Sequence, residues 1–416
     1  MKSYKVLLIG ILISATIFTA AFALYAFILK SPTVIVQSSP ESATVLINKI
    51  EQPSHRLTLK PGSYDLTVSF TGYVTYQGSI TLKRGQKLVL PILLKQVPTA
   101  TLLTTNLNTV PQFFDATHDV YFMGTNNTTL YRTRNLVGEA GVKVEAMTSN
   151  TLLGAEKVAV RPDGEVALIK MSDGIYLYDF KRYDFLNQSK TLWGTNIDDF
   201  AWSPNNLQVA YTYYGANGEQ SLMLSDIQNN NQRREIDLTK DKIDHPSIAW
   251  SDDSRHLLLV AKSTQTKTNY IYTYDLFIKK FAQLTEVGEV EGAKWSPDGE
   301  YIAYVAPGRD SAGSTTNIAW IAKSDGSGVT PLNVAVSSIS KLCWENNSTG
   351  VIVASNNTDG SIKLQSVDLS ANITPYQYAP PTKFNPDNIM SIPKDSRLLF
   401  TNDGQLMSLG LITSKY

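Results

Sequence analysis

The acidic residues that could do chemistry in this sequence stand in turns and at strand edges. Asp163 and Asp298 each follow proline and precede glycine, and pairs of carboxylates occur at 198–199 and 252–253. Aspartates that recur in this way could bind a ligand. A Pro-Asp-Gly turn, however, uses the Asp side chain to bond its own backbone and the glycine to reach a positive φ. We therefore interpret both aspartates as structural turn residues, and we expect the carboxylate pairs to be solvated.

The sequence has no arrangement typical of a metal site, a cofactor site or a catalytic nucleophile. Its four histidines are scattered without ligand spacing, and Cys343 is the single cysteine. Neither G-x-S-x-G nor H-E-x-x-H, P-loop or EF-hand patterns occur. The 37 Lys and Arg residues balance 37 Asp and Glu residues, which argues against a nucleic-acid partner. We predict a protein that is not an enzyme and uses no cofactor or metal, with an enzyme of unrecognised type as a minor alternative.

A repeated segment supplies the elements that position these side chains. Residues Gly292–Val305 read GAKWSPDGEYIAYV, an apolar strand that ends in Trp, a Ser-Pro-Asp-Gly turn and a second strand. Variants of this segment recur every 42 to 49 residues when aligned on the Trp, at positions Phe114, Val160, Trp202, Trp250, Trp295, Trp344 and Ile392. A period in the mid-forties built from short strands and turns is typical of a propeller blade. The sequence therefore predicts an all-β protein.

The repeat count predicts a β-propeller of seven blades over residues 97–416, with six blades as the alternative because the first and last copies are the weakest. After the last copy, only Gly404–Ile412 remains, which is enough for one more strand. We expect the segment at 100–105 to add the missing outer strand and to close the ring, which removes two exposed sheet edges. We interpret the four repeated tryptophans as rings wedged between neighbouring blades, and not as a stacking site for a ligand: Trp202, Trp250, Trp295 and Trp344.

These repeats resemble the TolB-like, or WD40-like, propeller repeats of exported bacterial proteins. The likeness is carried by Trp202-Ser203-Pro204-Asn205, Trp250-Ser251-Asp252-Asp253, Trp295-Ser296-Pro297-Asp298-Gly299 and Arg161-Pro162-Asp163-Gly164. The resemblance implies a scaffold, a binding module or a gating domain, and it names no ligand. A propeller-bearing serine peptidase would also need an α/β-hydrolase domain, for which no segment is left.

The N-terminal segment predicts a membrane anchor. Residues 1–4 form a short polar start, and residues 5–30 contain Val6–Leu29, which carries no charge over 24 residues. About 20 apolar residues suffice to cross a bilayer as a helix. Lys2 and Lys5 favour a cytoplasmic N-terminus, so the bulk of the chain is expected outside the cytoplasm, at the cell membrane. A signal peptide cleaved after Ala23 is the alternative.

Residues 31–96 predict a small β-sandwich of six short strands. The expected strands are 33–38, 44–47, 54–59, 63–70, 78–82 and 87–94, separated by Gly and Pro turns. The segment resembles the PEGA domain of bacterial and archaeal surface proteins through Ser39-Pro40-Glu41-Ser42-Ala43, Val45-Leu46-Ile47-Asn48, Pro61-Gly62-Ser63-Tyr64 and Gly72-Tyr73. Ser42 stands where that motif usually has glycine. The resemblance implies a non-catalytic surface module, here a spacer beside the membrane.

The turn pattern also predicts which face of the propeller binds a partner. If the Ser-Pro-Asp-Gly turns between the first and second strands lie on one face, the turns between the second and third strands gather on the other. The longer of these are 215–219, 262–268 and 306–316. Long loops on a rigid scaffold are common places for recognition. We expect Tyr213 and Tyr214 to offer a stacking surface, and Arg309 and Asp310 to make polar contacts.

Together these features favour a non-catalytic, membrane-anchored extracytoplasmic protein that presents its propeller to a protein or cell-wall glycan partner. The alternative is a structural component of the cell envelope that acts by self-association. The apolar run at 88–94, LVLPILL, is the segment that would support it. No nucleic-acid partner is expected.

Overall fold

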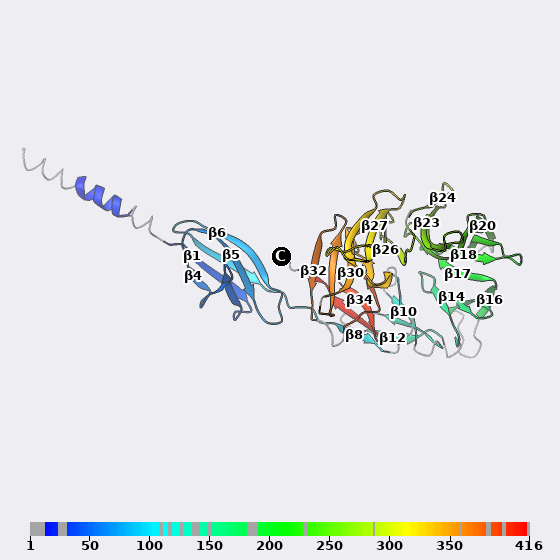
Figure 1. The fold of residues 1–416 in the computed structure, drawn as a ribbon. Helices are drawn as coiled ribbons and strands as arrows, with labels where there is room; N and C mark the ends of the chain where they lie inside the picture. The colour runs from blue at the N-terminus through cyan, green and yellow to red at the C-terminus, as the bar shows by residue number, and fades with distance from the viewer. Residues whose placement is uncertain are drawn as a thin grey trace, which may run out of the picture. The chain divides into compact units, whose positions relative to one another are not determined.

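The computed structural model describes most of the chain, and its regular elements are almost entirely β-strands (Figure 1). The described residues are 13–23, 31–105, 107, 111–114, 119–124, 128–134, 142–148, 152–180, 190–227, 231–285, 288–357, 359–379, 384–392 and 397–413. Contacts divide the chain into two compact units, a smaller one that comprises Met1–Pro98 with Ile412–Tyr416 and a larger one at Thr99–Leu411. Each unit has its own hydrophobic core.

Part of the expected membrane segment is helical. Residues 13–23 form a helix, and the remainder of segment 5–30 lies outside the described residues. Within the described part of the chain, no helix is long and apolar enough to span a bilayer. The anchor therefore stays a prediction from the sequence.

The smaller unit consists of two sheets, with strand orders β4-β1-β7 and β3-β2-β5-β6. Their strands are β1 (Thr33–Ser39), β2 (Thr44–Ile47), β3 (Ile50–Glu51), β4 (Arg56–Thr58), β5 (Gly62–Ser69), β6 (Tyr76–Leu82) and β7 (Lys87–Leu93). Alternating positions such as Val34, Val36, Leu66 and Val68 are buried between the sheets, as the period of two along a strand requires. The structure has seven strands where the sequence predicted six. Strand β3 was missed because it is two residues long and follows a turn at Asn48-Lys49.

The larger unit consists of seven antiparallel sheets in the part of the chain that the structure describes. Blades 1 to 3 are β9 (Gln112–Phe114), β10 (Asp119–Met123), β11 (Leu130–Arg134), β12 (Lys143–Ala146); β13 (Lys157–Val160), β14 (Val166–Met171), β15 (Gly174–Asp179), β16 (Lys190–Gly194); and β17 (Ile197–Trp202), β18 (Gln208–Tyr214), β19 (Gln220–Asp226), β20 (Asn231–Asp237). In each blade the strands pair in chain order, so a blade is one meander.

Blades 4 to 7 continue the pattern. They are β21 (Ile243–Trp250), β22 (His256–Ser263), β23 (Asn269–Asp275), β24 (Lys280–Gln283); β25 (Gly292–Trp295), β26 (Tyr301–Arg309), β27 (Thr315–Lys323), β28 (Thr330–Ala335); β29 (Leu342–Trp344), β30 (Gly350–Asn356), β31 (Ile362–Asp368), β32 (Ile373–Gln377); and β33 (Asn388–Ser391), β34 (Arg397–Asn402), β35 (Gln405–Gly410), β8 (Thr101–Thr104). A short 3₁₀ helix, η2 (Ile339–Lys341), precedes β29, and the last described strand of the chain is β36 (Ile412–Thr413).

Blade 7 takes its outer strand from the beginning of the unit. Strand β8 pairs antiparallel with β35, which places a segment near residue 100 beside the last strands of the chain (Figure 1). The ring is also closed by side chains, because Leu399 and Leu406 of blade 7 share one buried cluster with Val120 and Phe122 of blade 1. Similar apolar clusters join each of the remaining pairs of consecutive blades, from blades 1 and 2 to blades 6 and 7. In its described residues, the larger unit is thus a seven-bladed propeller, and the six-blade alternative was wrong.

The repeated Ser-x-Asp turns between the first two strands of a blade are held by their own side chains. In blade 5, the Ser296 hydroxyl donates to Asp298 and accepts the Tyr301 N–H at 2.9 Å, while Asp298 Oδ1 accepts the Glu300 N–H at 3.0 Å. Gly299 has a φ of 71°, which favours glycine at this place. Asp163 has the same position in blade 2, where its Oδ1 accepts the N–H two residues on at 3.0 Å.

The repeated tryptophans lie between blades. Their indole N–H groups donate to a main-chain carbonyl of the preceding blade at 2.9 to 3.0 Å: Trp202 to Ala159, Trp250 to Ala201 and Trp344 to Lys294. Trp295 differs, because its Nε1 is buried without a hydrogen-bond partner among the described residues. These contacts fix the blades to one another and leave the opposite face of the ring to be shaped by other residues.

Candidate functional site

A pocket of about 330 Å³ opens where blades 2, 3 and 4 bring strand ends together. Its walls include the turn between β14 and β15 at 172–173 and the connection between β16 and β17 at 195–196. Because successive strands run in opposite directions, these connections lie on the face opposite the Ser-x-Asp turns. We call it the Tyr214 pocket, after the residue at the end of β18 that lines it.

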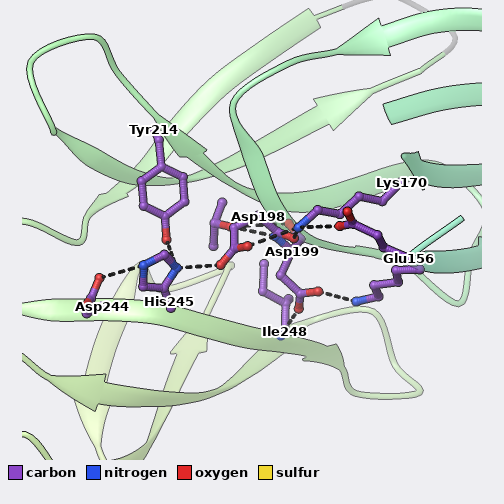
Figure 2. Close-up of polar contacts among 10 residues, drawn as sticks. Glu156, Lys170, Asp198, Asp199, Tyr214, Asp244, His245 and Ile248 are labelled. Atoms are coloured by element: carbon purple, nitrogen blue, oxygen red, sulfur yellow. Dashed lines mark hydrogen bonds and ion pairs between the residues drawn. The ribbon is translucent and has the colours of Figure 1, made fainter. Parts of the chain in front are cut away.

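His245 is the centre of the polar contacts in this pocket (Figure 2). Its Nδ1 lies 2.7 Å from Asp198 Oδ2 and 2.9 Å from the Tyr214 hydroxyl, and the Tyr214 and His245 rings stack with centroids 5.2 Å apart. Because a carboxylate only accepts hydrogen bonds, Asp198 is satisfied when Nδ1 carries the proton. His245 Nε2 lies 3.5 Å from Asp244 Oδ1. Three blade elements, β17, β18 and β21, therefore meet at one imidazole.

Lys170 approaches the same carboxylate from blade 2. Its Nζ donates to the Asp198 carbonyl oxygen at 2.8 Å and to Asp198 Oδ1 at 3.2 Å, and it lies 3.8 Å from Glu156 Oε2. Burial raises the pKa of Asp198, but the hydrogen bonds from His245 and Lys170 lower it by more than burial raises it, so the pKa of Asp198 is below its usual value. Asp198 is therefore held as an anion between a lysine and a histidine.

Asp199, the neighbour of Asp198 on β17, contacts its own blade and both neighbouring blades. Its Oδ2 accepts the Ile248 N–H at 2.7 Å, its own N–H donates to Thr212 Oγ1 at 2.9 Å, and its other oxygen forms an ion pair with Lys157. The side chains of Asp198 and Asp199 are 36% and 16% exposed. The expectation that this carboxylate pair is solvated was wrong, because β17 lies between strands of two neighbouring blades that supply cations and donors.

Two β-bulges aim the central side chains into the pocket. In β17 the register shifts between Ile197 and Phe200, and in β21 it shifts between Asp244 and Ser247. His245 has a φ of 45°, in the left-handed region, and Pro246 follows it. A bulge redirects a side chain, and proline is tolerated there because the ladder is already interrupted. Irregular backbone thus places Asp198 and His245 face to face.

The pocket lining carries more carboxylates than ammonium groups. Glu156, Asp173 and Asp198 supply three carboxylates to its lining, against the single ammonium of Lys170. Burial raises the pKa of Tyr214, and the charges of Asp198 and Asp244 raise it further, so its hydroxyl stays protonated. Among the described residues, no group of three or more His, Cys, Asp or Glu side chains is placed to hold a metal ion. The arrangement suits a bound group that donates hydrogen bonds.

The structure brings only one of the four expected contact residues into the pocket. Tyr214 lines it, whereas Tyr213 is not among the lining residues and is 39% exposed. Arg309 and Asp310 belong to blade 5 and are not among the lining residues. Asp310 Oδ1 accepts the N–H groups of Ala312 and Ser314 at 3.0 and 2.8 Å, so it holds a turn.

The prediction of a long loop at 306–316 was wrong, because most of this segment is paired in strands. Strand β26 continues to Arg309, and its pairing with β27 runs to Arg309 opposite Thr315, so only a short turn is left. Sequence reasoning also missed Lys170, Asp198 and His245. A signal was present, because His245 follows Asp198 by 47 residues, one repeat, so both stand at the start of the innermost strand of their blade.

Comparisons with known proteins agree with this architecture. Residues 31–98 match the profile of the PEGA domain. A search of curated proteins gives no match to the chain. Similar solved structures are the hydrazine synthase of Kuenenia stuttgartiensis, with 11% identity, a TM-score of 0.50 and coverage of 75% of this chain and 97% of that one, and an oligogalacturonate lyase in complex with manganese, with 12% identity, a TM-score of 0.53 and coverage of 75% and 93%.

A structure described as "putative TolB from Agrobacterium tumefaciens" is also similar, with 18% identity, a TM-score of 0.41 and coverage of 65% of this chain and 94% of that one. At such identities, likeness in structure concerns the fold and not the activity. The match at residues 31–98 and the ring of seven blades lead to one conclusion: the chain carries a PEGA domain followed by a β-propeller.

Proposed function

We propose that this protein is a membrane-anchored, extracytoplasmic binding protein whose propeller holds a protein or cell-wall glycan partner at the Tyr214 pocket. Residues 5–30 are the anchor in this proposal, and the PEGA domain is the spacer. The apolar run Val6–Leu29 and the lysines that flank it support the anchor. The partner-binding role rests on the pocket.

The arrangement around His245 is the observation that carries the proposal. Side chains from three blades are fixed there by hydrogen bonds to one another before any ligand arrives, and such preorganisation lowers the entropy cost of binding. The excess of carboxylates favours a partner group rich in donors, such as the hydroxyls of a glycan or the amines of a protein. Lys170 and Asp198 are paired with each other, so neither is free to act as a nucleophile.

The test is retention of a partner from an envelope extract by the full-length protein in detergent. His245→Ala is the informative variant, because the His245 side chain is 62% exposed and its removal leaves the Lys170–Asp198 pair in place. Arg309→Ala is the matched control on the same face of another blade. We expect His245→Ala to weaken retention by about tenfold, the effect of losing roughly 1.4 kcal/mol, and Arg309→Ala to leave it unchanged.

Equal retention by wild type and His245→Ala would contradict the proposal. Two structural neighbours bear the names of enzymes. Turnover of a peptide or glycoside panel that is abolished by Asp198→Asn would replace the binding role with a catalytic one.

Self-association is the second candidate, and one observation favours it. Strand β7 is at the edge of its sheet, and the side chains of Val89 and Leu93 on its outer side are 43% and 73% exposed. Pro91 lies between them and removes a backbone donor from this edge, which is a common way to discourage strand pairing. Sedimentation of the wild type and of Leu93→Asp would decide: a dimer that the aspartate dissociates favours self-association, and a monomer in both removes it.

A further inference from the structure

A second pocket, of about 540 Å³, lies between blades 4 and 5. Its walls are mainly apolar, with Leu284 following the outer strand of blade 4 and the remaining apolar side chains belonging to blade 5: Tyr304, Ala306, Pro307, Trp320 and Val329. We call it the Tyr304 pocket. It shares no lining residue with the Tyr214 pocket. Its volume is within the range of about 300 to 1,000 Å³ that is common for small-molecule sites.

The aromatic wall of this pocket is formed in advance. Tyr304 and Trp320 pair across β26 and β27, with ring centroids 6.2 Å apart and planes 10° from parallel. The Trp320 indole N–H donates to the Ala306 carbonyl at 3.3 Å. Gly308 allows this placement, because a Cβ there would lie 2.5 Å from Ile318 and 3.1 Å from Trp320. A flat ring entering the pocket would meet aromatic surface without displacing it.

The Tyr304 hydroxyl is the unusual feature of the pocket. Tyr304 is only 5% exposed as a residue, and among the described residues its hydroxyl makes no hydrogen bond to the protein. The hydroxyl is not one of the fully buried unpaired atoms, so it remains accessible to a molecule that enters the pocket. Burial raises the pKa of Tyr304 to about 12, so the group is a neutral donor. A hydrogen-bond donor in the wall of a mainly apolar pocket favours a ligand that carries a hydrogen-bond acceptor.

We infer that the Tyr304 pocket binds a flat, mainly apolar ring compound that carries one hydrogen-bond acceptor. The ring system lies against Tyr304 and Trp320, and its acceptor receives a hydrogen bond from the Tyr304 hydroxyl. Leu284 and Val329 close over the apolar body, and the acceptor fixes its orientation. This site is independent of the proposed function, because it concerns other blades and another kind of ligand.

The test uses 2-naphthol and naphthalene, which differ by one hydroxyl. Each is titrated into the full-length protein in lipid nanodiscs and followed by calorimetry. The wild type is expected to bind 2-naphthol about three- to tenfold more tightly than naphthalene, the effect of one neutral hydrogen bond. In Tyr304→Phe that preference disappears while naphthalene still binds, which also shows that the variant is folded. Val329→Trp, at an exposed position of the lining, narrows the pocket and weakens both probes by about tenfold or more.

Val329→Trp also gives the background from partition into lipid. If the wild type binds neither probe above this background, the pocket is not a ligand site and the inference is overturned. It is equally overturned if the preference for 2-naphthol persists in Tyr304→Phe, because the hydroxyl of Tyr304 would then have no part in recognition.

Discussion

On one face of the propeller, Ser296 and Asp298 bond the turn in which they stand; on the other, Lys170, Asp198 and His245 bond one another across three blades. Both groups consist of ordinary polar side chains near strand ends. In the first group each side chain finds its partners within five positions along the chain. In the second, the partners are 28 and 47 residues apart. The first arrangement stabilises a blade, and the second forms a site.

This difference separates structural residues from functional ones in a repeat protein. A side chain that recurs in each repeat, such as Trp344 or Asp298, does the same mechanical work in each blade. A side chain that occurs in one repeat only, such as His245, cannot be needed for the blade as such, because the other blades fold without it. We therefore expect changes at repeated positions to lower stability and changes at single positions to lower binding.

The largest effect is expected at an inter-blade tryptophan. Trp344 is buried and its indole donates to Lys294 of the preceding blade, so Trp344→Ala should lower the free energy of unfolding by about 3 to 5 kcal/mol. Urea unfolding followed by circular dichroism measures this change. Phe277→Ala, at a side chain that is 82% exposed, is the control and should stay within about 0.5 kcal/mol. Similar values for both variants would break the comparison.

A smaller loss is expected at the repeated turn. Ser296→Ala removes the acceptor of the Tyr301 N–H and the donor to Asp298 in a buried position, so it should cost about 1 to 3 kcal/mol. The same urea experiment measures this loss of stability. In the envelope-extract experiment, Ser296→Ala should retain the partner as well as the wild type does. Retention that falls with Ser296→Ala would mean that the two faces are not separate in function.

The opposite outcome is expected for His245→Ala. Its side chain is mainly exposed and its contacts are polar, so the free energy of unfolding should change by less than about 1 kcal/mol. Thermal unfolding of this variant beside Ser296→Ala measures the contrast directly. A loss as large as that of Ser296→Ala would show that the imidazole is a structural latch, and the binding proposal would lose its main support.

The smallest effect concerns pH. Because the pKa of Asp198 is lowered in the folded protein, its ionised form contributes stability that is present above the unfolded pKa of about 4 and is lost as pH falls through the folded value. Asp198→Asn should therefore be less stable than wild type at pH 7, and the difference should shrink below about pH 4. Unfolding curves measured between pH 3 and pH 7 test this. A constant difference across the range would argue against the ionised contact with Lys170 and His245.

Local patterns explain why much of the fold could be predicted. The segment around Trp295 and Asp298 specifies two strands and their connection within 14 residues, Gly292–Val305. The other copies of the repeat carry variants of the same pattern. The alternation of buried and exposed positions in Thr33–Ser39 does the same for the PEGA domain. Strand β3 was missed because its pairing depends on the neighbouring strand more than on its own two residues.

The candidate site could be predicted only in part, because its contacts are long-range. Tyr214 was expected as a contact residue, but Asp198 was taken as solvated and His245 as a scattered histidine. Both judgements treated each residue with its chain neighbours alone. Arg309 and Asp310 do not line the Tyr214 pocket, and the loop expected around them is shorter, since a polar run that looks like a loop continues as a paired hairpin when its partner strand is present.

By itself, the sequence determined the repeat, the inter-blade tryptophans and the β-sandwich that precedes them, because these follow from periods and turns of a few residues. The choice between seven and six blades came from the sheets of the structure. Only the tertiary structure decided which side chains meet in a pocket. The bulges at Asp198 and His245 turn two side chains toward each other, and the packing of neighbouring blades brings residues of blades 2, 3 and 4 into one pocket. Packing in three dimensions also placed Tyr304 and Trp320 side by side in the wall of a second pocket, together with Leu284 of the preceding blade.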